Sequence, residues 1–272
     1  MGEFRGIEAV PEFAARWALE AAKKYNNESV LTATINASGG CPIGAKALCG
    51  EYCFAHRSWS EDTSPRTESN INYLLDAKIL EEKGKEVGIF MSYDTEPFPG
   101  GVVCEISRKI LLSMTKKPPA ALLIHSHTAN IGNDETVALI RDVSQATNVI
   151  VGIGFETDSE NVGNSEHFHS VSDRLKAFEK LNGAGVKTQA STTPLLGFLD
   201  YPGFVKRFYE MGTHRVMIGE LRKEFDIGGD ERASKLDIGL PPLSEKDAMQ
   251  ICSQYNFPGG VGVREDFYVT MT

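Results

Sequence analysis

The chain has 272 residues, of which 41% are hydrophobic and 24% charged, an ordinary globular composition that excludes a fibre, a coiled coil or a disordered chain. Its net charge of −9, from 28 Lys and Arg against 37 Asp and Glu, makes nucleic acid an unlikely partner. No apolar run approaches the roughly 18 residues that span a bilayer, and the first residues do not form a secretory signal. We therefore expect a cytoplasmic protein with no membrane partner.

Short apolar or β-branched segments alternate along the chain with longer segments of helical spacing. Apolar runs without clean alternation are typical of strands buried on both faces of a parallel sheet. Strict alternation of strands and helices predicts right-handed βαβ crossovers and an α/β fold. The predicted strands are residues 29–35, 86–91, 120–125, 148–155, 186–191 and 214–218.

Apolar residues at helical spacing predict a helix before the first strand, helices between several strands, and a final helix. Ser172 and Asp173 are the expected N-cap of the helix that begins at Arg174. Six repeats suit either an open doubly wound sheet or a curved partial barrel, and the periodicity alone does not choose between them. The predicted helices lie near residues 11–25, 71–79, 106–114, 137–143, 174–181 and 245–255.

Three of the five cysteines, Cys41, Cys49 and Cys53, lie close together in the Gly-rich loop after the first predicted strand. In βα folds this loop faces the ligand-binding side, and thiolates are soft ligands that suit an iron–sulfur cluster or zinc. An odd number of cysteines argues against a disulfide framework. Core packing and a zinc site completed by His56 are the alternatives. We favour the iron–sulfur cluster, because zinc modules usually pair their ligands as C-x2-C and no second pair is present.

The end of this loop, residues 52–56, reads aromatic-Cys-aromatic-Ala-His and resembles the cluster loop of radical S-adenosylmethionine enzymes, most closely the spore-photoproduct-lyase-like branch. The spacing Cys41-x7-Cys49-x3-Cys53 departs from the usual C-x3-C-x2-C of that superfamily. A second register would use Cys49, Cys53 and His56. The resemblance implies a [4Fe-4S] cluster whose open iron binds S-adenosyl-L-methionine.

The resemblance continues at the ends of the later strands. Residues 93–97 are similar to the ending that meets the amino group of the methionine moiety, and in residues 126–128 His127 replaces the lysine that reaches its carboxylate. Residues 154–157, 174–185 and 192–197 match further motifs in order. The cofactor-binding residues implied by the resemblance are Tyr52, Asp94, Thr95, Glu96, His127, Glu156, Thr157, Arg174 and Leu195.

This resemblance covers about residues 30–221 and implies a partial (β/α)6 TIM-type barrel. We expect an N-terminal helix within residues 1–28, the barrel in residues 29–221, and a C-terminal extension in residues 222–272 that closes the barrel. The implied activity is cleavage of S-adenosylmethionine to a 5′-deoxyadenosyl radical that abstracts hydrogen from a small polar substrate. An electron donor such as flavodoxin or ferredoxin would be the partner.

Cys252 and Cys104 remain outside the cluster motif. A thiol donates a hydrogen atom readily, so Cys252 first and Cys104 second are candidate catalytic donors, which favours a sugar or aminoglycoside epimerase. Core packing is the alternative for both. Acidic residues such as Asp158 and Glu160 would suit a cationic substrate. Two other functions stay open, namely a radical lyase or modifier of nucleic acid or peptide, and a non-catalytic zinc or redox-binding protein.

Overall fold

In the described residues of the computed structural model, eight strands form one sheet in the order β1 to β8. Parallel strands alternate with helices along most of this sheet, so the predicted α/β class is confirmed. The predicted helices near residues 11–25 and 71–79 lie outside the described residues. The structure describes residues 7–9, 31–44, 49, 53, 63–66, 88–92, 95–160, 169–220, 239–240 and 243–263.

All six predicted strands are present, with ends that agree within about two residues, and each runs parallel to its neighbours among the six. Their apolar runs are buried, as expected for strands covered on both faces. They are β2 (Leu31–Ile35), β3 (Gly88–Met91), β4 (Ala121–Ser126), β5 (Asn148–Gly154), β6 (Lys187–Thr192) and β7 (Arg215–Ile218).

Two further strands extend the sheet at its edges. β1 (Ile7–Ala9) pairs antiparallel with β2, and β8 (Val261–Val263) pairs parallel with β7. Each has only three residues, which is too short for hydrophobic periodicity to reveal. The C-terminal part of the chain therefore contributes a strand to the sheet as well as a helix.

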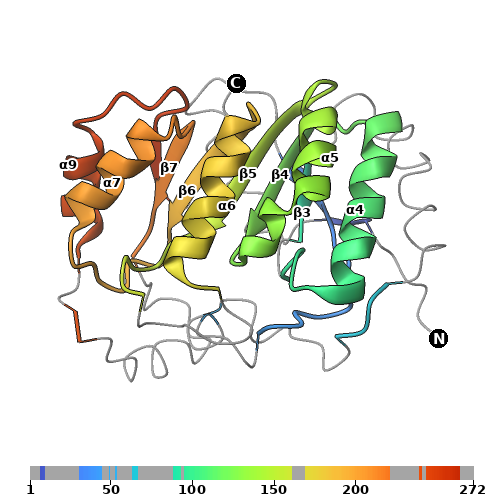
Figure 1. Cartoon of the computed structure of the whole chain (residues 1–272), viewed down its shortest axis with the longest axis horizontal. Coiled ribbons are helices and arrows are strands. Elements are labelled where there is room, and N and C mark those ends of the chain that lie inside the picture. Colours follow the sequence, from blue (N-terminus) through green and yellow to red (C-terminus); the bar gives the residue numbers. More distant parts are fainter. Residues whose placement is uncertain are drawn as a thin grey trace.

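Five helices of the described residues cover the sheet. Figure 1 shows α4 to α7 side by side on one face, with α9 beside α7. Their bounds are α4 (Gly101–Lys116), α5 (Asp134–Ser144), α6 (Val171–Gly183), α7 (Tyr201–Glu210) and α9 (Glu245–Cys252), and a short 3-10 helix, η3 (Ala129–Gly132), follows β4.

Two helix predictions need correction. The N-cap of α6 is Ser170, whose side chain accepts the N–H of Asp173, so Ser172 and Asp173 already belong to the first turn. Helix α7 was not predicted, because Pro202 and Gly203 in its first turn have the composition of a loop. Proline is tolerated there because the first helical N–H groups have no partner within the helix.

The apolar core lies between the sheet and these helices. At its centre Phe155 packs against Phe178, Phe204 and Phe208, with ring centroids 5.1 to 5.7 Å apart. Such aromatic pairs add specific geometry to the burial of apolar area. Because Phe155 directly follows β5, this cluster fixes the carboxyl end of that strand against α6 and α7.

A polar row crosses the sheet from β4 to β7. His125, Gly152, Gln189 and Arg215 are in register on neighbouring strands. Arg215 Nε donates to Gln189 Oε1 at 2.5 Å, and a Cβ at Gly152 would lie 2.6 Å from His125 Cδ2. In this row Arg215 and Gln189 are therefore joined by a hydrogen bond, and the glycine leaves space for the imidazole. No helix in the described ranges is long and apolar enough to cross a membrane.

Candidate functional site

The cysteine loop starts from a fixed point at the carboxyl end of β2. The N–H of Arg66 donates to Ala37 O at 3.0 Å, and Arg66 Nε donates to Ser38 O at 3.2 Å. Gly39 N donates to Ser64 O at 3.1 Å. Residues 64–66 therefore hold the start of the loop, although they are more than twenty positions away in sequence.

The three loop cysteines share one electrostatic neighbourhood. Burial, with smaller contributions from the nearby Glu96 and Cys53, raises the pKa of Cys41 to about 12, while N–H groups of Ile43 and Glu96 that face the thiol oppose the shift. Burial, followed by Cys53 and Cys41, raises the pKa of Cys49. The loop after β2 therefore brings these thiols together and places Cys41 against the segment that follows β3.

The donor set of these cysteines fits an iron–sulfur cluster. Among the described residues, no trio of His, Cys, Asp or Glu side chains is placed to bind one metal ion. A zinc site needs every sulfur about 2.3 Å from a single ion, whereas a cluster spreads its thiolate ligands over several irons. Three neighbouring thiols on one loop are the donor set that such a cluster takes. His56 and Tyr52, both named from the sequence, lie outside the described residues.

Glu96 joins the loops that follow β3 and β4. Its Oε1 accepts hydrogen bonds from Phe98 N at 3.0 Å and Ser126 Oγ at 2.6 Å, and its Oε2 accepts one from His127 N at 2.8 Å. Burial raises the pKa of Glu96, while His127 and these hydrogen bonds act in the opposite direction. Thr95 Oγ1 lies 3.4 Å from Asn36 Oδ1 at the end of β2. Asp94 lies outside the described residues.

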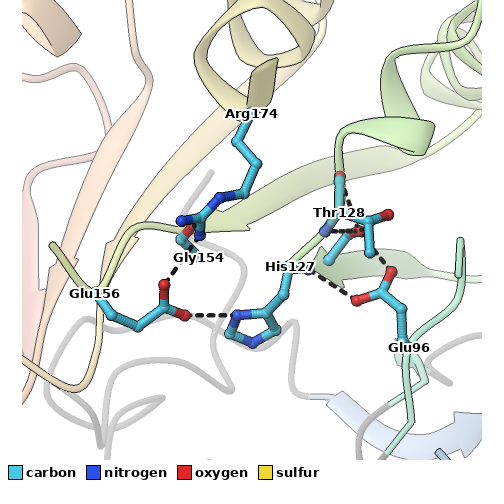
Figure 2. A network of polar contacts seen from close by, with 7 residues as sticks. Glu96, His127, Thr128, Gly154, Glu156 and Arg174 are labelled. Carbon is cyan, nitrogen blue, oxygen red and sulfur yellow. Dashed lines mark hydrogen bonds and ion pairs between the residues drawn. The ribbon is translucent and has the colours of Figure 1, made fainter. Parts of the chain in front are cut away.

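Glu156 is the centre of a buried ion-pair chain, shown in Figure 2. Its Oε1 lies 2.6 Å from His127 Nδ1, and its Oε2 accepts from Arg174 Nη1 at 2.9 Å. Arg174 Nη1 also donates to the carbonyl of Gly154. Burial alone would raise the pKa of Glu156, but Arg174 and His127 hold it well below its usual range. This carboxylate is therefore charged and orients both the His127 imidazole and the Arg174 guanidinium.

Gly154 makes room for this chain. A Cβ at this position would lie 2.6 Å from His127 Cε1 and 2.9 Å from Glu156 Oε1, far inside ordinary contact. The last residue of β5 thus has to lack a side chain for the imidazole that follows β4 to reach the carboxylate beyond β5.

Thr157 lies in the loop after β5 and Leu195 in the loop after β6, at the same edge of the sheet. Leu195 N donates to Gly219 O at 2.9 Å, and Leu196 N donates to Glu156 O at 3.0 Å. Thr157 Oγ1 accepts from Ser159 N at 3.2 Å and shapes the turn after Glu156. The loop after β6 is therefore tied to the ends of β5 and β7.

The two remaining cysteines lie in the apolar core beneath the helices. Cys252 is fully buried, with its sulfur 3.5 Å from Tyr201 Oη. The sulfur of Cys104 accepts the N–H of Gly100 at 3.1 Å in the first turn of α4. These contacts are what the packing alternative requires, and the hydrogen-donor role stays a prediction.

Sequence reasoning missed the structural use of two acidic side chains. Both carboxylate oxygens of Asp158 accept backbone N–H groups at 2.7 Å, and Glu160 Oε1 accepts Ser172 N at 2.8 Å. Their expected role toward a cationic substrate therefore has no support in these contacts. The alternating acids at 156, 158 and 160 were the available signal, because Asp158 and Glu160 each accept backbone N–H groups from a different segment, before α7 and at the start of α6.

Comparison with known proteins identifies the fold. No family model and no curated protein match the chain. Its structure is similar to spore photoproduct lyase, including a variant with bound AdoMet and dinucleoside spore photoproduct, at a TM-score of 0.59 and 14% identity, covering 96% of this chain and 87% of that one. It is also similar to Streptococcus suis SuiB bound to the precursor peptide SuiA, at a TM-score of 0.55 and 14% identity, covering 92% of this chain and 52% of that one.

The chain thus has the fold of spore photoproduct lyase over almost its whole length and spans about half of SuiB. The resemblance seen in the cysteine loop and the strand ends named the same branch, and at the level of the fold it is confirmed. Identities near 14% carry the comparison no further than the fold.

Proposed function

We propose that the chain is a radical S-adenosylmethionine enzyme in which Cys41, Cys49 and Cys53 hold a [4Fe-4S] cluster. The observation that carries this proposal is that Cys41 packs against Cys49, with Cys53 and Glu96 near both thiols, at one carboxyl edge of the sheet. In parallel α/β folds, ligands bind at that edge. The shared fold with an enzyme that binds AdoMet supports the same conclusion.

The buried polar chain would form the wall that receives S-adenosylmethionine. Glu156 holds His127 at Nδ1, so the opposite nitrogen of the ring is directed away from this carboxylate (Figure 2). A ring held in this way can present positive charge to a carboxylate of the cofactor. Leu195, tied to the end of β7, would supply an apolar contact from the neighbouring loop.

When bound, the cluster and S-adenosylmethionine would supply an electron and a 5′-deoxyadenosyl radical. The chain's own part is to orient the cofactor and to exclude water. Glu96 and Glu156, both almost fully buried, tie together the loops around the place where the cofactor would lie. Hydrogen bonds from N–H groups to the sulfur of Cys41 would tune the potential of the cluster.

We propose a segment of a polymer as the substrate, in preference to a free sugar. The dinucleoside bound by spore photoproduct lyase and the peptide bound by SuiB both support this choice. The epimerase hypothesis has weaker support, because its first donor candidate, Cys252, packs in the core beneath the helices. The net charge of −9 favours a peptide over a nucleic acid.

Anaerobic purification tests the proposal. We expect a brown protein with iron and sulfide that, once reduced, converts S-adenosylmethionine to 5′-deoxyadenosine. A colourless protein with stoichiometric zinc would overturn the proposal. Adding a spore-photoproduct dinucleoside, a peptide library or aminoglycosides then asks which class stimulates that cleavage, and stimulation by aminoglycosides alone would restore the epimerase.

A further inference from the structure

We infer that Asp158 is a positioning residue of the site. Its carboxylate holds the loop after β6 in a fixed position relative to Glu156. The inference rests on the proposed function, because that function places S-adenosylmethionine between these two loops. Asp158 Oδ1 accepts the N–H of Leu199 and Oδ2 accepts the N–H of Asp200, each at 2.7 Å. A carboxylate that accepts two successive backbone N–H groups makes charge-assisted hydrogen bonds, which are roughly twice as strong as neutral ones.

The far end of this contact is rigid. Asp200 is the N-cap of α7, and its side chain accepts the N–H of Gly203 at 3.0 Å. A Cβ at Gly203 would lie 2.8 Å from Asp200 Cγ, so the glycine is needed for this close approach. By holding the N–H of Asp200, Asp158 fixes the point at which the loop becomes α7.

The near end is the site itself. Asp158 is two residues beyond Glu156, and the Ser159 N–H bound to Thr157 Oγ1 shapes the turn between them. The same segment contacts the loop after β5 a second time, where Leu196 N donates to Glu156 O. The segment from 195 to 200 is therefore held to the loop after β5 at both of its ends, and Asp158 provides one of the two contacts.

Loss of Asp158 would leave the loop held by the backbone hydrogen bonds of Leu195 and Leu196 and by the packed ring of Phe198. The loop could then shift while the ion-pair chain of Glu156 stays in place, because Asp158 contacts none of its members in the described structure. Displacements of about 1 Å in a positioned site can reduce rates by about 100-fold. The effect would appear first in cofactor binding, since Leu195 belongs to the predicted cofactor-binding residues.

The test uses the full-length, cluster-loaded protein with Asp158→Asn and Asp158→Ala. Asn keeps the shape and one acceptor oxygen, but it presents an NH2 group to the second backbone N–H. Glu160→Gln is the matched control, because Glu160 lies in the same loop and, among the described residues, its carboxylate accepts a hydrogen bond from the first turn of α6 and none from residues 195–200. We would measure the dissociation constant and KM for S-adenosylmethionine, kcat for 5′-deoxyadenosine formation, and amide exchange of residues 195–203.

We expect Asp158→Ala to raise the dissociation constant and KM by roughly 10-fold, with a smaller change in kcat. Exchange should be faster in residues 195–203 and unchanged in α5. Asp158→Asn should lie between Ala and the wild type, and Glu160→Gln should match the wild type. Faster exchange with unchanged affinity would mean that Asp158 has a purely structural role, which would overturn the inference. Unchanged exchange would mean that Asp158 does not hold the loop in place. A wild-type protein that fails to cleave the cofactor would count against the proposed function, while the exchange result would still decide whether Asp158 holds the loop.

Discussion

The five cysteines lie in two regions of the molecule that differ in the side chains around them. Cys41, Cys49 and Cys53 lie at the carboxyl edge of the sheet, where they influence one another and where Cys41 and Cys49 lie near Glu96. Cys104 and Cys252 lie under the helices among apolar side chains. The same residue type thus occurs in two different environments, and its position in the fold decides which one it has.

Burial by itself does not distinguish the two regions. It raises the pKa of Cys41 to about 12 and that of Cys252 to about 11. The difference lies in what could stabilise a thiolate. At the edge, three thiols gather where a cluster would supply positive charge, and metal binding would release their protons. In the core, Cys252 contacts the hydroxyl of Tyr201.

The largest expected effect follows from this contrast. Cys49→Ser should abolish iron incorporation and 5′-deoxyadenosine formation, because it removes a thiolate ligand. Cys252→Ala is the matched control from the core and should retain the iron content of the wild type. Iron and sulfide analysis after anaerobic reconstitution measures both. Equal iron loss in the two variants would contradict the assignment of cluster ligands to the edge region alone.

The next effect concerns the charged chain at the edge. Glu156→Gln leaves Arg174, which is 0% exposed, without its carboxylate, and breaking a buried pair in this way costs about 3–5 kcal/mol of unfolding free energy. The exposed pair of Arg108 and Glu135 is the control, since surface pairs are worth about 0–1 kcal/mol. Denaturant unfolding at pH 7 of Glu156→Gln and Glu135→Gln gives the comparison. Similar losses in the two variants would contradict a stabilising role for the buried chain.

A smaller effect is expected at Gly154. In Gly154→Ala the new methyl group would overlap the His127 ring and Glu156, and overpacking of this kind typically costs about 1–3 kcal/mol. Gly183→Ala is the control, because a Cβ there meets nothing within 4 Å and alanine favours the helix. Thermal unfolding should therefore show a lower Tm for the first variant and an equal or higher Tm for the second. The prediction fails if both variants melt like the wild type.

The smallest expected effect is on the change of the unfolding free energy with pH. Burial, together with His127, lowers the pKa of His125 to about 3 from its ordinary 6.5. Below pH 6.5 the unfolded chain binds a proton that the folded chain does not, so stability falls as the pH falls. This single group contributes at most about 1.4 kcal/mol per pH unit. Unfolding free energies between pH 7 and 5 should show a shallower slope for His125→Gln, and identical slopes would place the acid sensitivity elsewhere.

Much of the fold could be predicted because buried strands have a clear hydrophobic pattern. All six strands from β2 to β7 were predicted from apolar runs. β1 and β8 were missed, because three residues carry no period, and α7 was missed because Pro202 and Gly203 look like a turn. The N-cap of α6 was misplaced by two residues, since Ser170 and Ser172 are equally good caps by composition.

The candidate site was predicted in its location and only partly in its contacts. Glu96, His127 and Glu156 each follow a predicted strand, and the carboxyl ends of parallel strands meet at one edge. The sequence does not show which of these side chains contact one another, because that depends on distances in the folded chain. The Glu156–His127 contact depends on the space left by Gly154, and Asp158 became meaningful only once the loop after β6 was seen beside it.

The chain's order of apolar runs and its cysteine loop were enough to determine an α/β sheet with a group of thiols at one edge, because local patterns dictate strands and consecutive parallel strands share an edge. The tertiary structure alone decided which carboxylates hold the loops together and which thiols lie in the core. Those assignments depend on contacts between segments far apart in sequence, and only the packing of the folded chain creates them.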